Sequence, residues 1–389
     1  MRIAVPREIV PHENRVALVP ETVGKLVKSG LEVAVETNAG APAMFLDDAY
    51  RQAGALLVSD VPTLYGGADV VVKVREPVPS ESLGVHEAEL VREGGTLIAF
   101  LGRDAHSDAA QRLAARRVAA FSMELIPRIS RAQKMDALSS MSTVAGYKAV
   151  LLGAGALGKF FPLLMTAAGT IAPARVFVLG AGVAGLQAIA TARRLGAVVE
   201  AFDVRPAVRE EVQSLGATFV GHELLDQAAV AAGGYAKEMT PEQQAKQRQL
   251  VAERLKQSDV VISTAMVPGR KAPILIPEET VRGMRPGSVI VDLAAEMGGN
   301  CELTQPGADV VRHGVTILGP LNLAATLPVH ASQMYARNVL ALLTHLLKDG
   351  RLHLDFEDEI TRETCLVRPP SGTRSDAAAT STMTAGRAS

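Results

Sequence analysis

Residues 175–204 read RVFVLGAGVAGLQAIATARRLGAVVEAFDV, and this stretch constrains the fold more than any other. A hydrophobic run leads directly into G-x-G-x-x-G, which is followed by a segment of helix-forming residues and a second hydrophobic run. This is the pattern of a β–α–β unit that binds a dinucleotide. We expect Gly180 to make the tight turn, Gly182 to let the backbone approach a pyrophosphate, and Gly185 to let helix and strand pack closely. The pyrophosphate would face the helix N-terminus.

The residues after the second hydrophobic run indicate which dinucleotide binds. Asp203 would accept a hydrogen bond from a ribose 2′-hydroxyl and repel a 2′-phosphate, which favours NAD(H). Arg205 could instead receive a 2′-phosphate, lie on the surface, or lie over the adenine. Thr264 and Ala265 follow the later run DVVISTA, at the strand edge where ligands bind, and we expect them to line the nicotinamide pocket. The residues expected at the cofactor in this half are therefore Gly180, Ala181, Gly182, Val183, Gly185, Asp203, Val204, Arg205, Thr264 and Ala265.

A second G-x-G-x-x-G, GAGALG, occupies residues 153–158. The preceding LSSMSTVAGYKAVLL has apolar residues at helical spacing and does not read as a strand. Pro173 stands about 20 residues on, where the pattern requires an acid. We therefore predict the end of a helix and a glycine-rich turn between domains.

Hydrophobic runs alternate with helical segments along two stretches of the chain, which indicates βαβ units and parallel sheets. The fold class is thus α/β, with two Rossmann-like doubly wound parallel-sheet domains and a cleft between them. Residues 329–350 read as a long apolar helix that we expect to pack back on the first domain. The expected divisions are a first domain at 1–137 plus 329–368, a Rossmann domain at 138–328, and a disordered tail at 369–389.

Charge and cysteine content narrow the class of protein. Lys+Arg is 40 and Asp+Glu is 41, so there is no electrostatic signature of a nucleic-acid partner. Cys301 and Cys365 lack metal-ligand spacing and read as reduced thiols, so we expect no metal. We read His222, His313 and His330 as structural or surface residues. Neither a signal peptide nor a membrane-spanning helix is expected.

Several segments resemble the NAD(H)-binding alpha subunit of proton-translocating NAD(P) transhydrogenase. The similar segments cover about residues 1–350 and are VPREIVPHENRVALVPE, YKAVLL, GRKAPILIPEETVRGMRPGSVIVDLAAEMGGN and, most specifically, RISRAQKMDALSSMSTVAGY. The architecture is similar, more loosely, to that of alanine dehydrogenase.

Chemistry separates the two families. Oxidising an amino acid requires an acid–base group beside the hydride donor. The resemblance puts Gly102 where alanine dehydrogenases carry a histidine, and Glu296 where they carry an aspartate. Lys73 is retained, and Arg15 is kept in both families. A structural ion pair explains Lys73 and Arg15 as well as a functional role does.

The resemblance also implies where the nicotinamide end of the cofactor lies. It points to the loop RISRAQKMD and to Arg128, Gln133, Asp136 and Ser139. Asp136 and Ser139 would bond the carboxamide or ribose, Arg128 would pair with Asp136 or bond the carboxamide, and Gln133 would reach toward the second nucleotide. From the residues alone, a polar linker with a solvated Arg128–Asp136 pair is the alternative.

GGYAKEMT (233–240) resembles the mobile loop of the family, with Gly234 and Tyr235 closing over the nucleotide. An ordinary surface excursion is the alternative interpretation.

The family implies hydride exchange between NAD(H) on this chain and NADP(H) on a partner subunit. The implied partners are a second copy in a homodimer, an NADP(H)-binding beta subunit, and a membrane-spanning subunit that carries protons. The chain would then be cytoplasmic and peripheral on the inner face of the cell membrane. Two alternatives remain: an NAD-dependent alanine or other amino-acid dehydrogenase, and an NAD-sensing module without chemistry.

Overall fold

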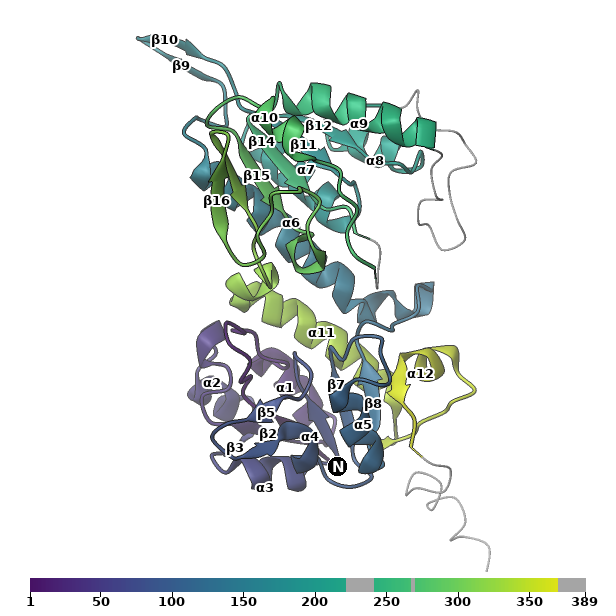
Figure 1. Ribbon diagram of the computed structural model, residues 1–389. Helices are drawn as coiled ribbons and strands as arrows, with labels where there is room; N and C mark the ends of the chain where they lie inside the picture. The colour runs from purple at the N-terminus through teal and green to yellow at the C-terminus, as the bar shows by residue number, and fades with distance from the viewer. Residues whose placement is uncertain (222–240, 267–269, 370–389) are drawn as a thin grey trace, which may run out of the picture. The chain divides into compact units, whose positions relative to one another are not determined.

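The computed structural model describes residues 1–221, 241–266 and 270–369 (Figure 1). The chain divides into two compact units, which we describe separately. Unit 1 contains Met1–Met141 and the chain from Ala325 onward, and unit 2 is Ser142–Ala324. Both crossings fall close to the expected boundaries at 137 and 329. The expected tail from 370 onward lies outside the described residues.

Unit 1 is built on a seven-stranded sheet in the order β20-β8-β7-β4-β1-β2-β3. Its pairs are parallel apart from β20, which is antiparallel to β8. The elements before the crossing are β1 (Arg2–Val5), α1 (Pro20–Lys28), β2 (Glu32–Glu36), η1 (Ala41–Ala43), α2 (Asp47–Gln52), β3 (Leu56–Val58), α3 (Val61–Gly66), β4 (Val70–Val72), β5 (Pro79–Ser80), β6 (Val85–His86), α4 (Glu87–Leu90), β7 (Thr96–Ala99), α5 (Asp108–Ala115), β8 (Ala119–Ser122) and η2 (Ser130–Met135). The chain returns with α11 (Pro328–Leu346), β18 (Leu347–Lys348), β19 (Arg351–Leu352), α12 (Glu359–Thr364) and β20 (Cys365–Val367).

Unit 2 has a second seven-stranded sheet in the order β13-β12-β11-β14-β15-β17-β16. Its pairs are parallel apart from β16, which is antiparallel to β17. The helix α6 (Ala137–Ala156) leads into this unit. The elements that follow are β9 (Leu164–Thr166), β10 (Gly169–Ile171), β11 (Arg175–Leu179), α7 (Val183–Arg194), β12 (Val198–Phe202), α8 (Val208–Ser214), β13 (Thr218–Phe219), α9 (Pro241–Leu255), β14 (Val260–Ser263), α10 (Glu278–Arg282), β15 (Val289–Asp292), η4 (Ala295–Met297), β16 (Asp309–Arg312), β17 (Val315–Leu318) and η5 (Leu323–Thr326).

Both sheets have the topology of a doubly wound fold. In unit 1 the chain moves outward from β1 through β2 and β3, then returns to place β4 on the other side of β1. Unit 2 repeats this with β11, β12, β13 and then β14 beside β11. Ligands of such sheets bind beyond the carboxyl ends of the two strands at this reversal. In unit 2 these ends lead into Gly180 and Thr264, so the expected site lies at the favoured place.

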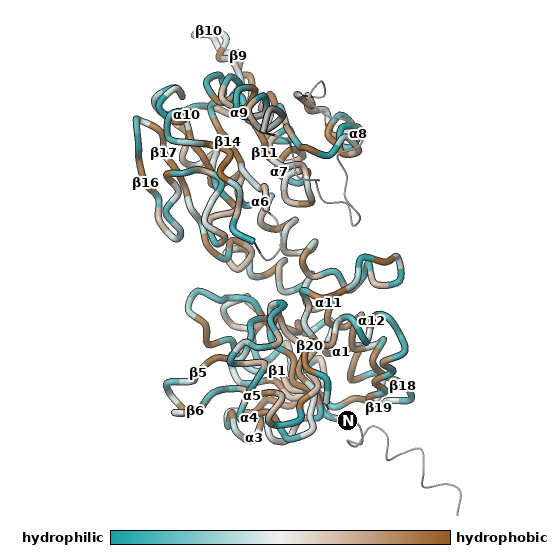
Figure 2. Tube along the Cα trace, turned by 45° about the vertical axis from the view of Figure 1, so that its right-hand side comes forward, coloured by the Kyte–Doolittle hydropathy of each residue, from teal (hydrophilic) through white to brown (hydrophobic). Residues whose placement is uncertain are grey.

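Burial explains why these runs form central strands. β4, β7, β14 and β15 are buried along their whole lengths, as expected for strands covered by helices on both faces. Figure 2 shows hydrophobic residues concentrated along the strands of each sheet. Unit 1 has a core around Leu97 and Leu113, whereas unit 2 has cores on both sides of its sheet, around Ile189 and Phe177.

The second glycine motif belongs to a helix, as predicted. Gly153 lies near the end of α6, and a Cβ there would lie 2.8 Å from Cγ1 of Val260 in β14. Gly146, earlier in the same helix, contacts the start of α7 so closely that a Cβ would overlap the carbonyl oxygen of Ala184. These glycines let α6 pack closely against unit 2.

Candidate nucleotide-binding site

The glycine loop of unit 2 assigns a different surrounding to each glycine. Gly180 has φ +93°, and a Cβ would lie 2.7 Å from Oγ1 of Thr264. A Cβ on Gly185 would overlap the carbonyl oxygen of Gly180. Gly182 differs, because the nearest heavy atom to its Cβ position is Nη2 of Arg205 at 3.8 Å. The first and third glycines thus serve packing, while the second leaves the loop open on one side.

The open side lies at the N-terminus of α7. Gly182 is the N-cap of this helix, and no side chain caps its first amides. Such amides, together with the helix dipole, form a site for an anion. The loop therefore fits a dinucleotide pyrophosphate, both in shape and in charge.

Asp203 has a structural role that the sequence did not reveal. The side chain is nearly buried, and its Oδ2 accepts a 2.7 Å hydrogen bond from the backbone amide of Ala181. It also accepts from the amide and guanidinium of Arg205, at 2.8 to 3.0 Å. Asp203 thus ties the end of β12 to the glycine loop, and Arg205 folds back over it. Of the interpretations weighed for Arg205, none included this ion pair.

Thr264 and Ala265 are fixed beside the loop by residues that sequence reasoning missed. The hydroxyl of Thr264 donates to the carbonyl of Gly180 at 2.9 Å. The buried side chain of Asn300 donates to the carbonyl of Ala265 at 2.8 Å and accepts from its amide at 3.1 Å. Asn300 in turn donates its own amide to Oδ2 of Asp292 at 2.8 Å.

Asp292 is the centre of this arrangement. It lies at the end of β15 with no solvent exposure. Its carboxylate accepts hydrogen bonds from Ser263, Ala294, Asn300, Cys301 and Thr304, at 2.6 to 3.1 Å. The only local signal was an acid at the end of a hydrophobic run, in VDLAAEMGGN.

The loop expected at the nicotinamide lies in unit 1 and contains η2. Arg128 and Gln133 are exposed, whereas Asp136 is half-buried. Asp136 accepts from the backbone amide of Ser139 at 2.9 Å and from its hydroxyl at 2.6 Å. The two residues expected to bond the nicotinamide end of the cofactor therefore form an ordered pair at the start of α6.

The expected site residues thus fall into two groups, one in each unit. Unit 2 brings together the glycine loop, Asp203, Val204, Arg205, Thr264 and Ala265. Unit 1 brings together Asp136 and Ser139, with Arg128 and Gln133 in the same loop. Gly234, Tyr235 and His222 lie outside the described residues.

A buried charge cluster occupies the strand reversal of unit 1. Lys73 follows β4 and has no solvent exposure; its Nζ lies 2.7 Å from Oε1 of Glu87 and 3.4 Å from Oε2 of Glu8. Tyr65 also donates to Glu87, at 2.8 Å. Burial raises the pKa of Glu8 despite the nearby ammonium. Burial alone would lower the pKa of Lys73, but the two carboxylates outweigh it and raise this pKa.

The other positions that separate the two enzyme families have plain surroundings. Arg15 is buried and forms a two-point ion pair with Glu13, at 2.6 and 2.7 Å. Gly102 has φ +72°, and no heavy atom lies within 4 Å of its Cβ position. Glu296 in η4 accepts from the backbone amide of Asn322. The cations Arg15 and Lys73 thus both have internal carboxylate partners.

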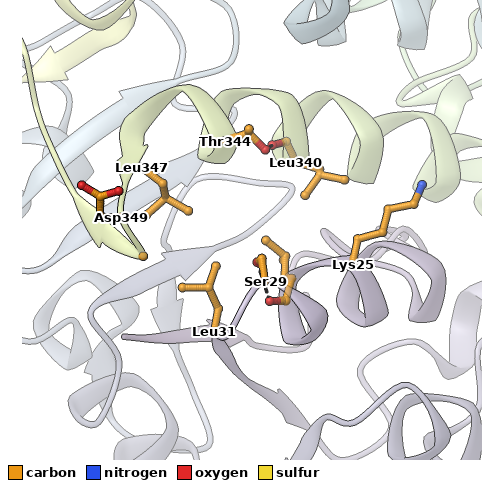
Figure 3. A pocket seen from close by; sticks show the side chains of 9 residues that line it. Lys25, Ser29, Leu31, Leu340, Thr344, Leu347 and Asp349 are labelled. Atoms are coloured by element: carbon orange, nitrogen blue, oxygen red, sulfur yellow. Dashed lines mark hydrogen bonds between the residues drawn. The ribbon is translucent and has the colours of Figure 1, made fainter.

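A cavity of about 310 Å³ lies elsewhere in unit 1, between α1 and α11 (Figure 3). Leu31, Leu340 and Leu347 line it. The hydroxyls of Ser29 and Thr344 donate to carbonyls of their own helices, at 2.7 Å each. These two hydroxyls are therefore already engaged, and the cavity is not part of the glycine-loop site.

Within the described ranges, no group of His, Cys, Asp and Glu side chains is arranged to hold a metal ion. Burial raises the pKa of the Cys301 thiol to about 11 and that of Cys365 to about 12. Of the helices in the described part of the chain, none has the length and hydrophobicity needed to cross a bilayer.

Comparison with known proteins agrees with this geometry. Residues 4–145 match the family "Alanine dehydrogenase/PNT, N-terminal domain", and residues 149–372 match "Alanine dehydrogenase/PNT, C-terminal domain". The chain is 50% identical to an NAD(P) transhydrogenase alpha subunit of Rhodospirillum rubrum, over 95% of this chain and 96% of that one.

Solved structures give the same order of similarity. A transhydrogenase from Sinorhizobium meliloti matches with a TM-score of 0.84 and 42% identity, covering 95% of this chain and 99% of that one. An L-alanine dehydrogenase matches with a TM-score of 0.72 and 31% identity, covering 90% and 96%. A general NAD(H)-binding role is common to this family, and the loop of unit 2 is built for it. The chain therefore belongs to the alanine dehydrogenase/PNT family, on the side of the NAD(P) transhydrogenase alpha subunits.

Proposed function

We propose that this chain is the NAD(H)-binding subunit of a proton-translocating transhydrogenase. It passes hydride between its own NAD(H) and NADP(H) held by a partner subunit. The relatives named as transhydrogenase subunits support this assignment, as does the open loop at Gly182. Proton translocation belongs to other, membrane-spanning subunits of the complex.

The observation that carries the proposal is the surrounding of Gly102. By the family resemblance this position would hold the acid–base histidine of an amino-acid dehydrogenase. Here it has no side chain, and its Cβ direction is open. Hydride transfer between two nicotinamides moves no proton at the reacting carbons, so it requires positioning groups and no base. A glycine is compatible with that reaction and not with amino-acid oxidation.

We assign positioning roles to the residues of the two units. Gly182 and the first amides of α7 bind the pyrophosphate, and Asp203 and Arg205 receive the adenosine ribose. Thr264 and Ala265 line the nicotinamide pocket. The Asp136–Ser139 pair and Arg128 hold the carboxamide or nearby ribose, and Gln133 faces the second nucleotide. NAD(H), when bound, supplies the carbon that gives or takes the hydride.

The β9–β10 hairpin supports a homodimer. Nearly every residue from Pro162 to Ala172 is exposed, and Figure 1 shows the hairpin extending away from the rest of unit 2. Residues 160–174 carry no charge, and Met165 is 80% exposed. An isolated two-stranded hairpin is marginally stable, and an uncharged apolar edge invites pairing. Because a twofold axis brings the same surface of both copies together, we propose that two hairpins cover one another.

The remaining partners follow from the transhydrogenase assignment. We propose that an NADP(H)-binding beta subunit docks on the side of Gln133. A membrane-spanning subunit would then hold this chain at the inner face of the cell membrane, in the cytoplasm. The chain's near balance of charge argues for recognition by shape and not by a strongly charged surface.

Direct label transfer tests the function. NADH carrying deuterium at C4 is incubated with this chain, NADP⁺ and the NADP(H)-binding subunit of a related transhydrogenase. We expect deuterium in NADPH, found by mass spectrometry, and none when the partner subunit is omitted. A parallel reaction contains pyruvate and ammonium without NADP⁺. Deuterated alanine there, with no label in NADPH in the first reaction, would replace our proposal with an alanine dehydrogenase.

A further inference from the structure

The six-residue helix η2 has three distinct faces. In a 3₁₀ helix residues three apart lie above one another. Ala132 and Met135 form the buried face. Gln133 shares a second face with Ser130. Arg131 and Lys134 form the third. The face that carries Gln133 is therefore set by how the other two faces are held.

The third face is held by the returning C-terminal segment of unit 1. Nη1 and Nη2 of Arg131 each lie 3.0 Å from Oδ2 of Asp358. Three residues further along η2, Asn338 of α11 donates to the carbonyl of Lys134 at 2.8 Å. Both contacts join η2 to sequence more than two hundred positions away, and both involve residues of the same face.

Asp358 is itself firmly placed. It is the N-cap of α12, and its Oδ1 accepts from the amides of Ile360 at 2.8 Å and Thr361 at 3.4 Å. Nε2 of His345 in α11 lies 3.2 Å from the same oxygen. The carboxylate is largely buried, with 21% of the side chain exposed, whereas Arg131 is 60% exposed. A fixed acceptor thus holds an exposed cation, and not the reverse.

We propose that Asp358 is a positioning residue for hydride transfer: it clamps Arg131 and thereby fixes the rotation of η2 that presents Gln133. This inference rests on the proposed function of the loop. Asp358 touches neither nucleotide in this scheme and acts through Arg131. Losing the clamp should lower the rate of transfer and leave the affinity of unit 2 for NADH nearly unchanged, because the glycine loop is untouched.

The test uses this chain with the NADP(H)-binding partner subunit and compares D358N, R131Q and R131K. Asn keeps the N-cap of α12 but loses the charge. We expect D358N and R131Q to lower the single-turnover rate of hydride transfer at least fivefold, with the Kd for NADH changed less than threefold. R131K retains the charge and should stay within threefold of wild type. E363Q is the matched control, since it removes a carboxylate of α12 whose partner is the exposed Arg362.

Hydrogen exchange over residues 130–136 gives a second readout that needs no activity. We expect faster exchange in D358N and R131Q than in E363Q. Unchanged exchange and rates within twofold of wild type would overturn the positioning role. If wild type itself transfers no hydride but D358N still loosens this segment, the proposed function fails and the positioning of η2 stands. R131Q guards against a folding defect in D358N, because Arg131 is largely exposed.

Discussion

Gly182 and Gly185 differ in what a side chain would meet, and this separates binding from folding. Gly182 has φ −75° and ψ −167°, which alanine adopts freely, and its Cβ position is uncrowded. We expect G182A to keep the wild-type melting temperature and to raise the Kd for NADH at least tenfold, about 1.4 kcal/mol. G185A should instead destabilise the fold by about 1–3 kcal/mol, since its Cβ overlaps backbone. NADH fluorescence titration and calorimetry measure both, and wild-type affinity in G182A would refute pyrophosphate binding at this loop.

Glu8 predicts a pH dependence of stability with a definite sign. Its pKa in the folded protein lies above the usual 4.5, because burial disfavours the charged form. Between these two values the folded chain binds the proton more tightly than the unfolded chain. The contribution of Glu8 is therefore complete below about pH 4.5 and is lost as the pH rises through the folded pKa, at up to about 1.4 kcal/mol per pH unit.

The E8Q variant removes this titration, so the stability of wild type relative to E8Q should fall as the pH rises from about 5 to 8. Melting curves of both proteins across this range measure the difference. E21Q is the control with the opposite sign, because hydrogen bonds from Lys25 and Arg337 lower the pKa of Glu21. The stability of wild type relative to E21Q should be flat over the same range and fall only in more acid solution. A difference from E8Q that rises with pH would contradict the buried, uncharged tendency of Glu8.

Single residues were predictable where their role is local. Gly180, Gly182 and Gly185 stand at fixed spacing in one turn, so the sequence alone indicates the duties that the structure makes plausible. Asn300 and Asp292 were missed, because their partners are up to thirty-five positions away along the chain. A buried amide or carboxylate has no periodic signature, and only the fold brings its donors together.

At the level of elements, the exposed β9–β10 hairpin gives the sharpest prediction. M165K places a charge on the proposed dimer surface, at a side chain that contacts solvent in the monomer. We expect the variant to fold normally and to shift the mass in solution toward a monomer, measured by light scattering or sedimentation. V311K is the matched control, since Val311 is also well exposed but lies on β16, at an edge of the unit 2 sheet. An M165K protein with unchanged mass would remove the hairpin from the interface.

The central strands were predictable and the edge elements were not. Runs such as VVIS in β14 and VIVD in β15 are apolar on both faces, which only a covered parallel strand requires. β9, β10, β16 and β20 are strands of three or four residues whose partners or edge positions no local pattern specifies. The long helix was expected to reach residue 350 but ends at Leu346, where the chain turns into β18.

For the whole molecule, the two units give separate cores and therefore separate responses to ligand. The sequence division into a discontinuous first domain and a Rossmann domain rested on alternation and on one long apolar helix. The contacts that join β20 to β8, and α11 to Lys73 through Tyr335, lie within unit 1 and explain why that unit takes the returning segment. Chains with two cores commonly depart from a single two-state transition. Each unit should thus report its own ligand.

ADP-ribose and NADH separate the contributions of the two units. ADP-ribose carries the adenosine and pyrophosphate that unit 2 would bind but lacks the nicotinamide. A ligand at about one hundred times its Kd adds about 2.7 kcal/mol to the state that binds it. We expect ADP-ribose to slow hydrogen exchange in β11, α7 and β12 only, whereas NADH should also slow it in residues 128–139 of unit 1. If NADH protects unit 2 alone, the RISRAQKMD loop does not contact the nicotinamide end, and the roles proposed for Arg128, Gln133, Asp136 and Ser139 fail. G182A should lose the response to both ligands, since both depend on the same pyrophosphate site.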